Sequence, residues 1–243
     1  MKTYGLIGFP LSHSFSQKYF KEKFQREKIL NREFKNFSLE SIDEFPSLIK
    51  QNPNLAGLSV TIPYKQSVIR FLEGIDATAK KIGAVNCVRV SDRKGFNTDI
   101  IGFMQSIQPL LKPYHHKALI LGSGGASKAI QYVLKKMKID YYLVSRIKNK
   151  DSKNKTYSDL NQEIIAAHSI IINATPLGMF PDINNYPRIP YEFLTPKHLL
   201  YDLNYNPQET LFLKKGKEKG AQIKNGLEML HVQAEKAWEI WNK

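Results

Sequence analysis

The sequence predicts an α/β protein built from two domains, and two observations lead to this fold class. Short apolar runs, typical of buried strands, alternate along the chain with amphipathic segments at helical spacing. Near the middle, one apolar run leads through the glycine-rich turn 122–126 into a helical pattern, which is a Rossmann-like arrangement. We expect an α/β substrate half over residues 1–100 and a nucleotide-binding half over 101–222, with a ligand cleft between them. A last helix over 226–243 could pack on either half.

The individual elements follow from apolar periodicity and from capping residues. Strands are expected over residues 4–8, 33–38, 55–60, 83–90, 118–121, 140–144, 169–174 and 198–205. Helices are expected over 15–24, 41–50 behind a capping box, 64–72, 77–82, 99–107 and 129–137, from Pro207 onward, and over 226–243. A turn is expected over 95–99.

The glycine turn is the strongest single motif in the second half. Gly122, Gly124 and Gly125 allow a tight turn that side chains would block. The N–H groups at the start of the following helix would favour a negatively charged pyrophosphate. Glycine turns also serve ordinary strand–helix packing, so this motif alone leaves both readings open.

The end of the next strand predicts which nucleotide binds. In NAD-binding folds an acidic residue about 20 positions past the glycine turn holds the ribose 2′-hydroxyl. This chain has Ser145 and Arg146 there instead. A carboxylate would repel a 2′-phosphate, whereas a guanidinium can donate two hydrogen bonds to one. A solvated basic loop explains residues 148–155 well, but Arg146 at the strand end favours the phosphate, and the expected cofactor is NADP(H).

Composition excludes several classes of protein. A hydrophobic content of 42% over 243 residues excludes wholesale disorder. No apolar run fits a signal peptide or a membrane span, and the single cysteine, Cys87, excludes an internal disulfide and fits a reducing cytoplasm. The net charge of +14 would suit nucleic acid, but the lysines are spread along helices without a recognition motif. We expect an anionic small-molecule substrate, with no nucleic acid, membrane or metal site.

Three polar residues stand out in the first half. Lys65 would lie in the first turn of the helix over 64–72, where a cation opposes the helix dipole, although surface lysines also occur there. Asn86 interrupts an apolar strand, so it either braces a loop or faces a ligand. Asp99 begins a helix, a common position for aspartate without any function. Because Lys65 and Asp99 both follow strand ends, they could converge and transfer a proton.

A set of motifs, in order along nearly the whole chain, resembles the shikimate dehydrogenase family. These motifs are Gly8–Ser16, Ser59–Lys65, Gly83–Asn86, Asn97–Asp99, Gly122–Ser127, Asn173–Met179 and Gly226–Ala234. The resemblance implies NADPH-dependent, reversible reduction of 3-dehydroshikimate to shikimate, a step of aromatic amino-acid biosynthesis. We expect a monomer or a homodimer, between which the sequence does not decide.

The resemblance also implies a role for particular residues. Lys65 and Asp99 would handle the proton. The implied substrate contacts are Ser14, Ser16, Ser59, Thr61, Asn86, Tyr205 and Gln233. The implied cofactor contacts are Gly122, Ser123, Gly124, Gly125, Ala126, Ser145, Arg146, Thr175, Leu203 and Gly226.

The chain departs from the family pattern at two places. Ser59 stands where the family usually has asparagine, so a shorter hydroxyl replaces an amide that would face the substrate. After Arg146 the usual threonine is replaced by Ile147, which puts a second arginine contact to the 2′-phosphate in doubt. Lys148 or Lys150 could stand in for it.

Two other readings compete with this one. A quinate/shikimate dehydrogenase or an NAD-preferring paralogue would share the motifs; Arg146 weighs against NAD, whereas Ser59 leaves the range of substrates open. A non-catalytic nucleotide sensor or a basic nucleic-acid binder would have no reason to keep Lys65, Asn86 and Asp99 together with a hydroxyl-rich loop.

Overall fold

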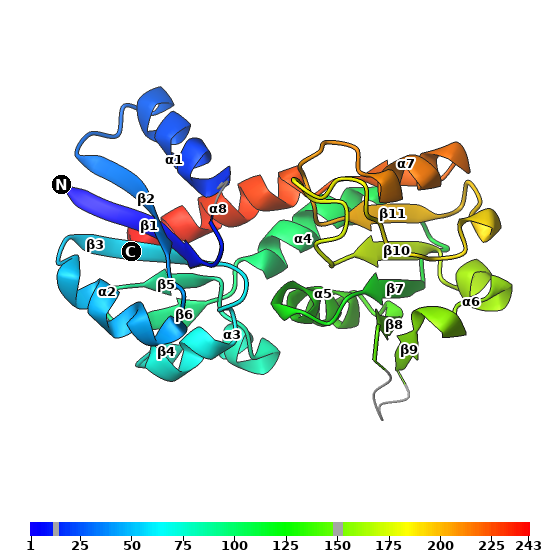
Figure 1. Cartoon of the computed structure of the whole chain (residues 1–243), viewed down its shortest axis with the longest axis horizontal. Coiled ribbons are helices and arrows are strands. Elements are labelled where there is room, and N and C mark those ends of the chain that lie inside the picture. The colour runs from blue at the N-terminus through cyan, green and yellow to red at the C-terminus, as the bar shows by residue number, and fades with distance from the viewer. Residues whose placement is uncertain (12–14, 148–152) are drawn as a thin grey trace. The chain divides into compact units, whose positions relative to one another are not determined.

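The computed structural model describes residues 1–11, 15–147 and 153–243, and the chain divides into two compact units. Unit 1 comprises residues 1–98 and 233–243, and unit 2 comprises residues 99–232 (Figure 1). The elements of unit 1 are β1 (Lys2–Gly8), α1 (Phe15–Arg26), β2 (Arg32–Ser38), α2 (Phe45–Gln51), β3 (Leu55–Val60), β4 (Gly74–Ile75), α3 (Ala77–Ile82), β5 (Cys87–Arg89) and β6 (Lys94–Phe96). The elements of unit 2 are α4 (Asp99–Ile107), β7 (Lys117–Leu121), α5 (Gly125–Lys136), β8 (Asp140–Ser145), β9 (Asn154–Thr156), α6 (Gln162–Ala167), β10 (Ile170–Asn173), β11 (Leu199–Asp202), α7 (Leu211–Glu218) and β12 (Gln222–Lys224). The last helix, α8 (Leu227–Trp241), begins in unit 2 and ends in unit 1.

Unit 1 is built on a mixed sheet in the order β2-β1-β3-β5-β6-β4. β1 pairs in parallel with β2 and β3, whereas β5 runs antiparallel to both β3 and β6. Successive side chains of a strand point to opposite faces, so Ile7 and Val60 pack with α2 and α3, while Tyr4 and Leu6 pack with α1 and α8. Both faces of this sheet are therefore covered.

The end of α8 belongs to the core of unit 1. Ala237 and Trp241 of this helix pack with Tyr4 and Phe20 on one face of the sheet. Gly57 of β3 lies directly beneath the indole, and a Cβ there would come within 2.2 Å of Trp241 Cγ. The sequence did not indicate which half of the protein the apolar side of the last helix packs against. In the structure, residues 233–241 of this helix pack on the sheet of unit 1.

Unit 2 is built on a fully parallel sheet in the order β12-β11-β10-β7-β8-β9. Counted within this unit, the order is that of the dinucleotide-binding fold, because β10 and β8 flank the first strand, β7, on opposite sides. The order reverses between β7 and β10, the place where such sheets bind ligands. The predicted Rossmann-like half is confirmed.

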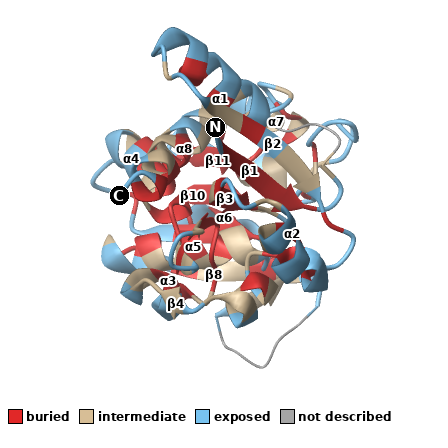
Figure 2. Cartoon of the chain, turned by 90° about the vertical axis from the view of Figure 1, so that its left-hand side faces the viewer, coloured by how far each residue is buried: buried red, intermediate tan, exposed pale blue. Residues whose placement is uncertain are grey.

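Apolar runs form central strands such as β3, β7, β10 and β11, because these strands are covered on both faces. In Figure 2 the strands β1, β10 and β11 are largely red, which marks them as buried. In unit 2, strand residues such as Leu119 of β7 and Leu200 of β11 belong to the same apolar cluster as Phe212 and Leu213 of α7. Within the described ranges, none of the helices is long and apolar enough to cross a membrane.

The helix expected over 64–72 does not form, and Lys65 lies in a turn ahead of a short 3-10 helix, Ser67–Phe71. The backbone oxygen of Lys65 accepts a hydrogen bond from Val85 N at 2.7 Å, while the Tyr64 hydroxyl donates to Leu39 O at 2.6 Å. These tertiary contacts fix the turn. The expectation of a lysine placed against a helix dipole is therefore wrong.

Three further local expectations are corrected. The segment expected as a turn over 95–99 contains β6, because Gly95 and Phe96 pair with Val88 and Cys87. Asn86 precedes β5 rather than interrupting a strand. The helix expected from Pro207 begins at Leu211 instead, with Thr210 as its capping residue.

Candidate active site

The glycine turn connects β7 to α5 in an open conformation. Gly122 has a positive φ of 103°, and a Cβ there would lie 2.8 Å from Thr175 Cγ2, so a side chain does not fit. Gly124 caps α5, and no atom lies within 4 Å of a Cβ built on it. Ser127, in the first turn of α5, donates from its hydroxyl to Gly124 O at 2.7 Å and stabilises the turn. Accessible N–H groups at a helix start fit a pyrophosphate.

The structure brings further predicted cofactor contacts to the same edge of the sheet. Thr175 follows β10 and lies against Gly122. Leu203 follows β11, and its N–H donates to Asn173 O at 3.0 Å. A Cβ on Gly226 would lie only 2.1 Å from Leu203 O, so this close approach of two backbones requires glycine. Tyr205 lies partly buried in the segment after β11.

Arg146 lies at the carboxyl end of β8 and is exposed. Ser145 just before it donates from its side chain to Ile147 O at 2.6 Å, which bends the chain away from the strand. Burial raises the pKa of Tyr157, and the positive charge of Arg146 opposes this shift. Lys148 and Lys150, the proposed second phosphate contacts, lie outside the described residues.

A buried amide–hydroxyl cluster lies at the end of β6 in unit 1. The side chain of Asn86 donates to Thr98 Oγ1 at 3.0 Å and to Gln233 Oε1 at 3.4 Å. Its oxygen accepts from the Thr98 backbone N–H at 2.7 Å. Asn86, Thr98 and Gln233 are 3%, 1% and 7% exposed, respectively. The structure thus joins two predicted substrate contacts, and it shows that Asn86 braces the loop at Thr98.

Two more predicted residues, Ser59 and Lys65, lie near Asn86 and the start of β5. Ser59 pairs with Cys87 across the strands, and Val60 N donates to Asn86 O at 2.8 Å. Lys65 is fixed nearby through its backbone contact with Val85. Ser59, Lys65 and Asn86 are therefore neighbours along one end of the sheet in unit 1.

The hydroxyl-rich loop starts beside the same end of this sheet. A Cβ on Gly8, the last residue of β1, would meet Thr61 Cγ2 at 2.4 Å, so the loop leaves β1 directly against Thr61. Ser16 is buried in the first turn of α1. Ser14 lies outside the described residues.

Asp99 is the first residue of α4 and is buried. It directly follows Thr98, whose side chain and N–H are fixed by Asn86. As a first-turn carboxylate it is favoured by the helix dipole. Asp99 belongs to unit 2 and Lys65 to unit 1.

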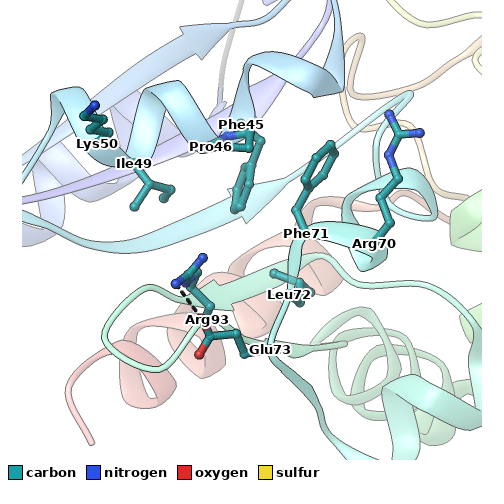
Figure 3. Close-up of a pocket in the computed structure, with 9 residues that line it drawn as sticks. All are labelled: Phe45, Pro46, Ile49, Lys50, Arg70, Phe71, Leu72, Glu73 and Arg93. Carbon is teal, nitrogen blue, oxygen red and sulfur yellow. Dashed lines mark ion pairs between the residues drawn. The ribbon is translucent and has the colours of Figure 1, made fainter.

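A cavity of about 540 Å³ elsewhere in unit 1 contains none of the predicted site residues (Figure 3). Its lining consists of Phe45, Pro46, Ile49, Lys50, Arg70, Phe71, Leu72, Glu73 and Arg93. Arg93 forms an ion pair with Glu73, and Arg70 with Asp43 at 2.5 Å. The guanidinium groups of both arginines that line the cavity are thus already paired within the protein. We assign this cavity no role in catalysis.

Two residues of the polar networks were missed by sequence reasoning. Thr98 lies in the middle of the Asn97–Asp99 motif, and its place beside Asn86 is set by the pairing of β5 with β6. Asp202 ends an apolar strand and is fully buried. The sequence did offer a signal for Asp202: a carboxylate at the carboxyl end of a parallel strand lies at the edge of the sheet where ligands bind.

The parallel sheet with its open glycine turn defines the class of this protein as a dinucleotide-binding α/β protein with a second α/β unit. Residues 6–88 match the sequence model of the shikimate dehydrogenase substrate binding domain. The chain is 40% identical to the shikimate dehydrogenase (NADP(+)) of Clostridium beijerinckii, over all of this chain and 93% of the relative. The chain belongs to the shikimate dehydrogenase family.

Solved structures agree with this assignment. Shikimate dehydrogenase 1 from Peptoclostridium difficile is 35% identical with a TM-score of 0.88, covering 100% of this chain and 92% of that one. Shikimate 5-dehydrogenase from Thermus thermophilus, solved in complex with NADP(H) and shikimate, is 26% identical with a TM-score of 0.84. The match to the latter covers 99% of this chain and 93% of that one.

Proposed function

We propose that this protein catalyses the reversible, NADPH-dependent reduction of 3-dehydroshikimate to shikimate in aromatic amino-acid biosynthesis. The observation that supports this most directly is the full-length similarity to NADP(+)-dependent shikimate dehydrogenases, 40% identical in one case. The open glycine turn and the cluster around Asn86 provide the two kinds of site that such a reaction needs.

NADPH supplies the hydride to the substrate carbon. The residues at the carboxyl edge of the unit 2 sheet would bind it: the 122–126 turn at the pyrophosphate, with Thr175, Leu203 and Gly226 on the neighbouring strands. The exposed guanidinium of Arg146 can donate two hydrogen bonds to the 2′-phosphate. Arg146 thereby favours NADP(H) over NAD(H).

The substrate is a ring with hydroxyl groups and a carboxylate, and unit 1 offers side chains of matching chemistry. Ser59, Thr61, Asn86 and Gln233 each provide hydrogen-bond donors and acceptors. Asn86 and Gln233 are held rigidly by Thr98, so their orientation is fixed before the substrate arrives. Ser14, Ser16 and Tyr205 complete the proposed set of contacts.

Reduction of a ketone also needs a proton at the carbonyl oxygen. We assign this step to Lys65, whose ammonium group can donate a proton, with Asp99 as its carboxylate partner. The backbone contact between Lys65 and Val85 fixes where the lysine side chain begins. In the reverse direction the same lysine accepts the proton from the hydroxyl group.

A second candidate is a shikimate/quinate dehydrogenase, and Ser59 favours it. Ser59 is buried and carries a short hydroxyl where the family usually has an amide, so a ring with an extra substituent would meet a smaller side chain there. The protein would act in the cytoplasm as a monomer or a homodimer, without nucleic acid or membrane partners.

The decisive experiment is an assay of NADP⁺ reduction by the purified protein with shikimate, with NAD⁺ and quinate as controls. We expect turnover with NADP⁺ and shikimate, and much lower rates with either control. Equal rates with quinate would select the second candidate, and no shikimate-dependent reduction of either cofactor would contradict both.

A further inference from the structure

We propose that Asp202 is a positioning residue for the cofactor, because its carboxylate fastens together the two loops that contain Thr175 and Leu203. The inference rests on the proposed function, since it assumes that these loops contact NADP(H). Asp202 would act through other side chains and would not touch the cofactor.

The carboxylate of Asp202 is the common acceptor of three hydrogen bonds from different segments. Thr210 Oγ1, at the start of α7, donates to its Oδ2 at 2.5 Å. Asn173 Nδ2, at the end of β10, and the backbone N–H of Asn204 each donate to its Oδ1 at 3.0 Å. The ends of two adjacent strands and the start of a helix thus meet at one fully buried carboxylate.

Asn173 connects Asp202 to Thr175 through hydrogen bonds from both ends of its amide group. The amide oxygen of Asn173 accepts from the backbone N–H of Thr175 at 3.0 Å and from its hydroxyl at 2.6 Å. An asparagine amide presents its oxygen on one side and its NH₂ on the other. Because Asp202 accepts from the NH₂, the oxygen is left facing Thr175. A side chain at position 202 that donated instead would favour the reversed amide.

Asn204 provides the second connection. Its backbone is held by Asp202, and its side chain donates to Thr175 O and to Leu177 O, both at 3.1 Å. The backbone oxygen of Asn204 also accepts from Gly226 N at 3.1 Å. Residues 175–177, 203–204 and 226 are therefore joined into one frame, and three predicted cofactor contacts lie in it.

The location of the frame argues for a role beyond stability. It lies at the carboxyl edge of the sheet, next to the point where the strand order reverses and where the glycine turn lies. His198, just before the other end of β11, is similarly buried and also hydrogen-bonded, to Thr195 and to Ile165 O. That histidine holds no predicted cofactor contact, so it serves as a matched control.

Protonation of the carboxylate sets the conditions of the test. Burial raises the pKa of Asp202 to about 7, while the hydrogen bonds from Thr210, Asn204 and Asn173 oppose the shift. At pH 8 the group is therefore largely the ionised acceptor that the three donors require.

The test compares Asp202→Asn with His198→Asn in the full-length protein at pH 8. The dissociation constant of NADPH is measured by fluorescence titration without substrate. For Asp202→Asn we expect this constant to rise roughly tenfold or more, since a charged acceptor is lost from three contacts. The KM for shikimate should change less than about twofold, and His198→Asn should bind NADPH like the wild type.

A milder variant guards against misfolding of Asp202→Asn. Thr210→Val removes one donor and keeps the carboxylate, and it should weaken NADPH binding by a smaller factor in the same direction. Unchanged NADPH binding in folded Asp202→Asn, or an equal loss in His198→Asn, would overturn the inference while leaving the proposed function intact. Failure of the wild type itself to bind NADPH would instead contradict the proposed function, and the inference with it.

Discussion

Lys65 lies in a turn whose backbone is fixed by Val85, in the same region of unit 1 as Ser59 and Asn86. If it transfers the proton, Lys65→Ala should lower kcat by about 10²–10⁴, because a positioned proton donor contributes that much. NADPH binding and the melting temperature should stay close to those of the wild type. Lys50→Ala, which removes a lysine from the separate cavity of unit 1, is the control. A kcat within a few-fold of the wild type would show that Lys65 is not catalytic.

Arg146 gives a prediction about cofactor choice. Its exposed guanidinium at the end of β8 can reach a phosphate, and only NADPH has one at the 2′ position. Arg146→Ala should raise the KM for NADPH by a factor of roughly 10 to 150, which corresponds to the loss of a charge-assisted hydrogen bond. The KM for NADH should scarcely change. Equal effects on the two cofactors would identify Arg146 as structural.

The variant Ser59→Asn tests whether serine at this position binds the substrate more weakly than the asparagine usual in the family. It is buried in β3 opposite Cys87, where a single hydroxyl replaces the amide that the family usually has. Ser59→Asn should lower the KM for shikimate several-fold, the equivalent of one neutral hydrogen bond. The KM for NADP⁺ should not change. A higher KM for shikimate would mean that the surroundings have closed around serine, and other substrates should then be screened.

At the scale of elements, β11 ends in a group whose charge makes stability depend on pH. The pKa of Asp202 is about 7 in the folded protein against an ordinary value of 3.8. Between these values the folded protein keeps a proton that the unfolded chain releases. The stability contributed by this group is therefore complete below 3.8 and is lost as the pH rises through 7. The charge of Asp202 acts on Tyr191, but burial raises the pKa of Tyr191 further from neutrality, so this tyrosine does not titrate in this range.

The comparison with Asp202→Asn isolates this effect, since asparagine does not titrate. The free energy of unfolding of the wild type, minus that of Asp202→Asn, should decrease between about pH 4 and pH 8 by at most about 4 kcal/mol. Urea denaturation at several pH values measures this difference. A difference that stays constant or increases with pH would contradict a raised pKa at Asp202.

The buried central strands were predicted more reliably than turns, helix starts and short strands such as β4, β9 and β12, which were not predicted. The difference has a physical reason. The run Ile170–Asn173 is buried on both faces of a parallel sheet, so its apolar composition alone indicates a strand. The turn at Lys65 and the start of α7 depend on partners outside their own segments, Val85 for the first and Asp202 at the end of β11 for the second. Local patterns carry no information about such contacts.

The same distinction applies to the site. Gly122 and Gly226 were predicted through motifs, and the structure explains both by a lack of space for a side chain. Asp202 was not predicted, because its importance arises from donors on three separate segments. The role of Asn86 as a brace for Thr98 was one of two readings that the sequence left open.

At the scale of the whole molecule, the sequence indicated two α/β halves because the glycine turn starts a second set of alternating strands and helices. It did not indicate where α8 belongs, since an apolar stripe shows that a face is covered without showing by what. The structure places residues 233–243 in unit 1, although they follow the whole of unit 2 in the chain. The substrate-binding unit is therefore discontinuous in sequence.

This discontinuity affects the order in which the protein can be completed during synthesis. Residues 1–98 leave the ribosome before unit 2 does, yet the aromatic cluster of Tyr4, Phe20 and Phe24 is covered by Ala237 and Trp241, which are made only after the whole of unit 2. All strands of the unit 2 sheet lie within residues 99–232, so they are made before Ala237 and Trp241. The nucleotide-binding unit can thus finish folding while the first unit still exposes an apolar face, and that face is covered only once residues 233–241 have been made.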